Sequence, residues 1–169
     1  MKNNEMNDCE TIEQYKDRVT YLESLVMKYK FDYLTKLMMK QDFYEKFNRV
    51  FEEYKFANEP FTLVLADIND LHNTNRLHGM HKGDELIVSV AKDLRQYFTF
   101  NQVFRISGDE FCILIRENIM PHDKVIEYMK KIKNIEFMAL KSNGHANPFN
   151  MFKEVDNNLT KIKGTKKRL

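Results

Sequence analysis

The chain has 169 residues, of which 43% are hydrophobic and 31% charged, and its formal net charge is +2. This length suits one domain with a sizeable core and a short appendage. The small net charge excludes a strongly basic protein that binds nucleic acid through its overall field. The apolar runs are shorter than the roughly 18 residues that a transmembrane helix needs, and the N-terminal residues are polar. We therefore expect a cytoplasmic protein without a membrane or nucleic-acid partner.

The first clear pattern lies near the N-terminus, where apolar residues recur at alternating spacings of three and four. These residues are Ile12, Tyr15, Val19, Leu22, Val26, Tyr29 and Tyr33. The spacing places them on one side of a helix. The pattern predicts either a stalk that pairs with a second copy as a coiled coil or a single amphipathic helix that packs on its own domain. Both interpretations place residues 1–30 before a globular part at residues 31–169.

The globular part alternates helical and strand patterns along the chain. Helical patterns cover residues 43–54, 86–97, 123–132 and 149–162. Strand patterns cover residues 61–66, 103–106, 111–115 and 135–140. This order predicts an α+β fold with a central, mostly antiparallel or mixed sheet flanked by helices, and we expect those helices to cover one face.

Two adjacent carboxylates, Asp109 and Glu110, lie in a turn between two of the strand patterns. Gly108 precedes them, and a glycine lets the backbone approach a ligand closely because it has no Cβ. Adjacent carboxylates repel each other, and a bound cation offsets that repulsion. Taken alone, the turn is either part of a metal-dependent phosphate site or a solvated hairpin.

A further acidic residue, Asp67, directly follows the apolar strand pattern at residues 61–66. A strand that is buried on both faces would hold this carboxylate rigidly. If the strand lies beside the hairpin, Asp67 and Asp109 converge and supply the hard oxygen ligands that Mg²⁺ prefers. The pair therefore predicts a metal site at one end of the sheet.

Four ordered segments resemble the signature motifs of the GGDEF family, the diguanylate cyclase domains. Residues 32–37 resemble DxLTxL, residues 67–84 resemble DxDxxKxxND..G...GD, residues 105–111 (RISGDEF) resemble RxGGDEF, and residues 163–167 resemble the end of AKxxGR. The resemblance covers nearly the whole globular part. It implies the palm-like fold of nucleotide cyclases, preceded here by the N-terminal stalk helix.

The resemblance also implies an activity, the condensation of two GTP molecules into cyclic di-GMP with release of pyrophosphate. The expected metal ligands are Asp67, the carbonyl of Ile68, Asp109 and Glu110. The cofactor would be Mg²⁺ or Mn²⁺. The expected catalytic residues are Asp67, Asp109 and Glu110. Cations are expected to matter more than a general base, because they lower the pKa of the attacking hydroxyl and neutralise charge in the transition state.

Substrate contacts are implied in the same way. The residues expected to bind GTP are Asn75, Asp84, Arg105, Gly108, Lys163 and Lys167, and Arg105 would either lie near the phosphates or support the hairpin. An amide at Asn75 and a carboxylate at Asp84 complement the acceptor and donors of the guanine edge. Each domain would hold one GTP, so two domains would meet face to face. We therefore expect a homodimer joined through the N-terminal helix.

Some positions depart from the family pattern. These are Ser107 for the first glycine of the signature, His72 for a lysine and Arg76 for an aspartate. They favour an alternative, a catalytically inactive GGDEF-like module that binds GTP and regulates another process. A second alternative is a synthase of another cyclic di- or oligonucleotide, although Asp84 favours guanine. Phe98 and Asn101 occupy the positions of the family's inhibitory RxxD motif, so no product-inhibition site is expected there.

Overall fold

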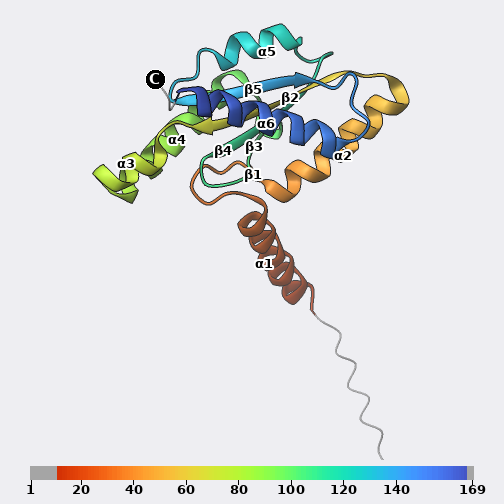
Figure 1. The fold of residues 1–169 in the computed structure, drawn as a ribbon. Coiled ribbons are helices and arrows are strands. Elements are labelled where there is room, and N and C mark those ends of the chain that lie inside the picture. The colour runs from red at the N-terminus through yellow and green to blue at the C-terminus, as the bar shows by residue number, and fades with distance from the viewer. Residues whose placement is uncertain (1–10, 167–169) are drawn as a thin grey trace, which may run out of the picture.

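The computed structural model describes residues 11–166 of the chain. Its elements are α1 (Ile12–Lys30), β1 (Met38–Met39), α2 (Lys40–Ala57), β2 (Phe61–Ile68), α3 (Leu71–His78), α4 (Met80–Tyr97), the 3₁₀ helix η1 (Phe100–Gln102), β3 (Val103–Arg105), β4 (Glu110–Arg116), α5 (His122–Met129), β5 (Ile135–Lys141) and α6 (Pro148–Lys166). Figure 1 shows α1 extending away from the sheet and the helices around it. The predicted α+β architecture, with a helix ahead of the globular part, is confirmed.

The sheet has five strands in the order β1-β3-β4-β2-β5. The central strand, β2, pairs antiparallel with β4 on one side and with β5 on the other. β3 and β4 form the expected antiparallel hairpin, and β1 adds a parallel edge beside β3. The sequence did not predict β1, because a strand of two residues is too short to show a periodic pattern.

Helices cover both faces of the sheet, so the expectation of one covered face is wrong. Every residue of β2 is buried. Its alternate residues Val64, Ala66 and Ile68 join a core with α4 and α5. Phe61, Leu63 and Leu65 face the other way and join a core with α2 and α6. An unbroken apolar strand requires cover on both sides, since successive side chains point to opposite faces.

The N-terminal helix α1 begins at a capping box. The Gln14 amide donates to the Thr11 hydroxyl at 3.3 Å, and the Thr11 amide donates to the Gln14 side chain at 2.6 Å. The helix ends at Lys30, so Tyr33 of the predicted seam lies beyond it. The exposed fraction of the seam residues ranges from 77% for Ile12 to 49% for Leu22. The described seam residues are therefore not covered by their own domain.

Candidate functional site

The candidate site is built around the C-terminal end of the central strand. In the sheet register, Asp67 of β2 lies directly opposite Glu110 of β4 and Glu136 of β5. Directly opposed residues of neighbouring strands project to the same face of the sheet. Glu110, Asp67 and Glu136, which we call the acidic row, therefore share the face that α6 covers. Two residues earlier on β2, Leu65 still belongs to the apolar core of that face.

The tip of the hairpin is tied to the end of β2. The Ile68 amide donates to the Asp109 carbonyl at 2.9 Å. Asp67, Asp109 and Glu136 line one hollow of about 600 Å³, together with His72 and Lys163 among others. We call this space the acid hollow. The predicted convergence of Asp67 and Asp109 on one place is therefore observed.

Lys163 of α6 reaches across the acid hollow to the central strand. Its Nζ lies 2.6 Å from Oδ2 of Asp67, whose side chain is only 7% exposed. Burial raises the pKa of Asp67, the hydrogen bond from Lys163 opposes this rise, and the charge of Asp109 adds to it. Since the net effect is a raised pKa, one lysine does not fully compensate this buried carboxylate. The position therefore favours an additional cation.

Ser107, which replaces a signature glycine, is accommodated without backbone strain. Neither Ser107 nor Gly108 has a positive φ, so the turn does not demand the left-handed conformation that favours glycine. The Ser107 hydroxyl donates to Oε2 of Glu110 at 2.8 Å. The amide of Ile106 donates to the Glu110 carbonyl at 3.0 Å. Serine here therefore adds a contact that orients Glu110.

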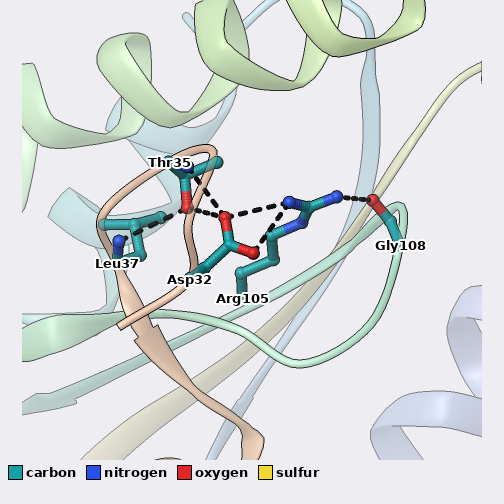
Figure 2. A network of polar contacts seen from close by, with 5 residues as sticks. All are labelled: Asp32, Thr35, Leu37, Arg105 and Gly108. Atoms are coloured by element: carbon teal, nitrogen blue, oxygen red, sulfur yellow. Dashed lines mark hydrogen bonds and ion pairs between the residues drawn. The ribbon is translucent and has the colours of Figure 1, made fainter. Parts of the chain in front are cut away.

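Arg105 links the hairpin to the turn that follows α1 (Figure 2). Its Nη1 donates to both carboxylate oxygens of Asp32 at 2.9 and 3.0 Å, and its Nη2 donates to the Gly108 carbonyl at 2.8 Å. Asp32 also accepts hydrogen bonds from the amide and the hydroxyl of Thr35, at 2.8 and 2.7 Å. Arg105 therefore supports the hairpin in this structure, and its expected contact with GTP stays a prediction.

The residues expected to hold the base lie on the helix pair α3 and α4. Gly83 packs so closely on α3 that an added Cβ would lie 1.8 Å from Oδ1 of Asn75. That oxygen is buried and has no hydrogen-bond partner in the described structure. Asp84 lines a hollow of about 480 Å³, the α4 hollow, which is also lined by Leu34 and Lys92 among others. Asn75 is not among the described residues that line the α4 hollow.

Two residues that line these hollows, Leu34 and Glu136, were not predicted from the sequence. Leu34 lies within the DxLTxL segment, which was interpreted only as the entry to the domain. Glu136 follows no motif, and its position became apparent only from the pairing of β5 with β2. Lys167, expected to contact the substrate, lies outside the described residues. The other predicted site residues are described, and their roles as ligands stay predictions.

The donor set suits the expected metal ion. Among residues 11–166, no three Asp, Glu, His or Cys side chains lie close enough together to hold a metal ion by themselves. Mg²⁺ does not need such a cage, because it binds through one or two carboxylates and completes its shell with water and phosphate oxygens. Asp67 and Asp109 in the acid hollow, with Glu110 beside them, offer oxygens of this kind.

The fold and the site together define an α+β domain with a candidate metal and phosphate site at the end of its central strands. The profile of one family, described as "Diguanylate cyclase, GGDEF domain", matches residues 29–147. The chain belongs to the GGDEF family. The family predicted from the four motifs is therefore confirmed.

Similar curated proteins are named as membrane proteins. An "uncharacterized membrane protein" of Staphylococcus haemolyticus is 30% identical over 127 residues, which cover 72% of this chain and 34% of the relative. A protein of the same description from Staphylococcus epidermidis is 29% identical over 128 residues, with the same coverage. The chain thus spans about a third of the length of these relatives. Within residues 11–166, no helix is both long and apolar enough to cross a bilayer.

Similar solved structures are GGDEF proteins. The coiled coil and GGDEF domain of DgcB from Caulobacter crescentus, in complex with c-di-GMP, has a TM-score of 0.77 and 17% identity and covers 90% of each chain. The diguanylate cyclase SiaD from Pseudomonas aeruginosa, in complex with its activator SiaC, has a TM-score of 0.69 and 15% identity, and the match covers 90% of this chain and 65% of that one. At these identities the comparison establishes the fold, and the predicted palm-like GGDEF fold is confirmed.

Proposed function

We propose that this protein is a diguanylate cyclase, which condenses two GTP molecules into cyclic di-GMP and pyrophosphate. The observation that carries the proposal is the acid hollow, in which Asp67 and Asp109 converge beside a lysine of α6. A buried carboxylate and a half-buried one beside Lys163 suit a triphosphate that arrives with a divalent cation. Membership of the GGDEF family supports the same reaction.

The chain's own residues would prepare the site for phosphoryl transfer. Asp67, the Ile68 carbonyl, Asp109 and Glu110 would hold Mg²⁺ or Mn²⁺, which when bound lowers the pKa of the attacking hydroxyl and neutralises phosphate charge. The sheet fixes Asp67, and the hydrogen bond from Ser107 orients Glu110. The 3′-hydroxyl of one GTP would attack the α-phosphate of the other, releasing pyrophosphate, and a second such step would close the ring.

Substrate recognition would divide between the two hollows. The carboxylate of Asp84 would accept hydrogen bonds from the N–H groups of guanine, and Leu34 would offer apolar surface to the base in the α4 hollow. Asn75 would contribute its amide from α3. Lys163 would contact the triphosphate in the acid hollow. The remaining expected contacts to GTP are those of Arg105, Gly108 and Lys167.

We propose that two chains pair through α1. The exposed apolar seam of this helix would bury its residues against a second copy as a coiled coil. Such pairing raises the effective concentration of one GTP-loaded domain near the other. Replacing Val19 and Leu22 together by glutamate should convert the dimer to a monomer in sedimentation experiments and lower product formation. Replacing exposed Lys16 by glutamate, beside the seam, is the control.

We also expect no regulation through an RxxD product site. Phe98, at the position of the motif's arginine, is 2% exposed and packs in the core. The side chain of Asn101, at the position of its aspartate, accepts a hydrogen bond from the Thr99 hydroxyl at 2.7 Å. A cytoplasmic location without nucleic-acid or membrane partners also remains a prediction.

An inactive GTP-binding module is the second candidate, and His72 favours it. This histidine lines the acid hollow where the family usually places a lysine. Incubation of the purified protein with Mg²⁺ or Mn²⁺ and with GTP, ATP or both, followed by mass spectrometry, tests the assignment. Cyclic di-GMP that disappears in Asp109→Ala is the expected result. GTP binding without product would favour the inactive module, and an adenine-containing product would favour another cyclic nucleotide.

A further inference from the structure

Glu136 is an acidic residue to which neither the motifs nor the proposed reaction gives a role. It lies on β5, directly opposite Asp67, and completes the acidic row on the side away from Glu110. It also lines the acid hollow together with Asp67, Asp109 and Lys163. Two residues further along the same face of β5, Met138 packs against the apolar core. The face therefore changes from apolar to acidic at the same level on β5 as on β2.

We propose that Glu136 is a further residue of the metal and nucleotide site, where it raises the affinity for the divalent cation that accompanies GTP. The inference rests on the proposed function in taking the acid hollow as that site. It adds one residue, outside the motifs of the family, to the groups that set the metal requirement of this protein.

The effect of Glu136 on cation binding is electrostatic. Directly opposed residues of antiparallel strands have Cβ atoms about 4.5–5.5 Å apart, so the charge of Glu136 lies near Asp67. At the effective dielectric constants of partly exposed sites, one nearby charge changes the affinity for a divalent cation by roughly 3- to 10-fold. The same charge repels a triphosphate that arrives without a metal ion. Glu136 should therefore act in opposite directions on the metal ion and on the metal-free nucleotide.

This opposition separates an electrostatic role from a structural one. A residue that only stabilises the fold would weaken both kinds of binding when it is replaced. Lys163 provides a further contrast, because its Nζ lies 2.6 Å from Asp67 and competes with a metal ion for that carboxylate. Lys163→Met should therefore bind Mn²⁺ more tightly in the absence of nucleotide, whereas Glu136→Gln should bind it more weakly.

In the test, Mn²⁺ is titrated into the full chain and the free ion is measured by electron paramagnetic resonance. The binding of metal-free GTP is measured separately, in the presence of excess chelator. Glu136→Gln should weaken Mn²⁺ binding by about 3- to 10-fold and tighten metal-free GTP binding. The matched control is Glu59→Gln, which removes the same charge from an exposed position just before β2. That position is roughly 25 Å from Asp67 along an extended strand, so its effect should be negligible.

Three outcomes would overturn the inference. In the first, Glu136→Gln leaves the Mn²⁺ affinity unchanged while Asp67→Asn weakens it. In the second, Glu136→Gln weakens the binding of Mn²⁺ and of metal-free GTP in parallel. In the third, the wild type binds no Mn²⁺. The first outcome does not contradict the proposed cyclase activity. Conversely, a wild type that shows the expected Mn²⁺ response but makes no cyclic di-GMP retains the inference and loses the proposed function.

Discussion

Asp32 and Asp67 are both largely shielded from solvent, and within residues 11–166 each forms an ion pair with one basic residue, but their surroundings differ. Asp32 accepts hydrogen bonds from Thr35 and from Arg105, which engages both of its carboxylate oxygens. Burial would raise the pKa of Asp32, but these bonds outweigh it and the pKa is lowered. The pKa of Asp67 is instead raised by burial and by the charge of Asp109, although Lys163 lies against one of its oxygens.

The difference indicates which carboxylate serves the fold and which serves a ligand. A carboxylate whose charged form is satisfied by neighbouring donors stabilises the structure that surrounds it. A buried carboxylate with a raised pKa beside like charges is a candidate for function, because a bound cation would relieve the cost of its charge. We therefore propose that the pairing of Asp32 with Arg105 serves the fold and that the acidic row serves a ligand.

Asp67→Asn should have the largest effect, and it should fall on activity. The amide keeps the shape of the side chain but removes the charge that would hold the cation, so cyclic di-GMP formation should fall by about 10³-fold or more. The melting temperature should stay the same or rise slightly, because a buried charge with a raised pKa is removed. Product analysis and thermal unfolding check the two halves. A marked drop in melting temperature would contradict the assignment.

Asp32→Asn should instead affect stability. It leaves the guanidinium of Arg105, which is 11% exposed, without its charged partner. The loss should cost about 2–4 kcal/mol of the free energy of unfolding and lower the melting temperature by roughly 5–15 °C. Asp17→Asn removes the same charge from an exposed position on α1 and serves as the control. Equal stability of the two variants would show that the network is dispensable.

Ser107→Ala should have a smaller effect on activity. The variant loses the 2.8 Å hydrogen bond that orients Glu110, whose carboxylate then samples more positions. We expect product formation to fall by about 2- to 5-fold with little change in stability, since Ser107 is exposed. Ser107→Thr, which retains the hydroxyl, should keep most of the activity. A full loss of activity in the alanine variant would mean that the hydroxyl does more than orient Glu110.

The pH dependence of stability should show the smallest effect, with opposite signs for the two residues. The pKa of Asp32 is lowered, so its stabilisation is present above about pH 3.9, its ordinary value, and is lost as pH falls through the lower folded value. The pKa of Asp67 is raised, so its ionisation opposes folding and acidification through that pKa adds stability. Melting temperatures from pH 7 to pH 3 should therefore fall less in Asp32→Asn than in the wild type. They should fall more in Asp67→Asn, and the reverse order would contradict these signs.

Local patterns predicted much of the fold and the central pair of the site. Short segments of sequence predict both the unbroken apolar run of β2 that leads to Asp67 and the hairpin that carries Asp109. The position of Glu136 and the pairing of Arg105 with Asp32 were not predicted, because they depend on contacts between distant segments. Glu136 required the register of β5 on β2, and Arg105 contacts Asp32 across 73 residues of sequence. The helix α3 was also missed as a separate element, because none of its residues is fully buried and no apolar stripe marks it.

The most direct test of the two assignments measures the cyclic di-GMP that Asp67→Asn and Asp32→Asn form from GTP and Mn²⁺, per folded molecule, at a temperature at which both variants are folded. We expect no detectable product from Asp67→Asn. Asp32→Asn should retain product within about tenfold of the wild type, because it loosens the hairpin without removing a carboxylate from the acid hollow. Equal activity in the two variants would contradict the assignment of the acidic row as the functional site.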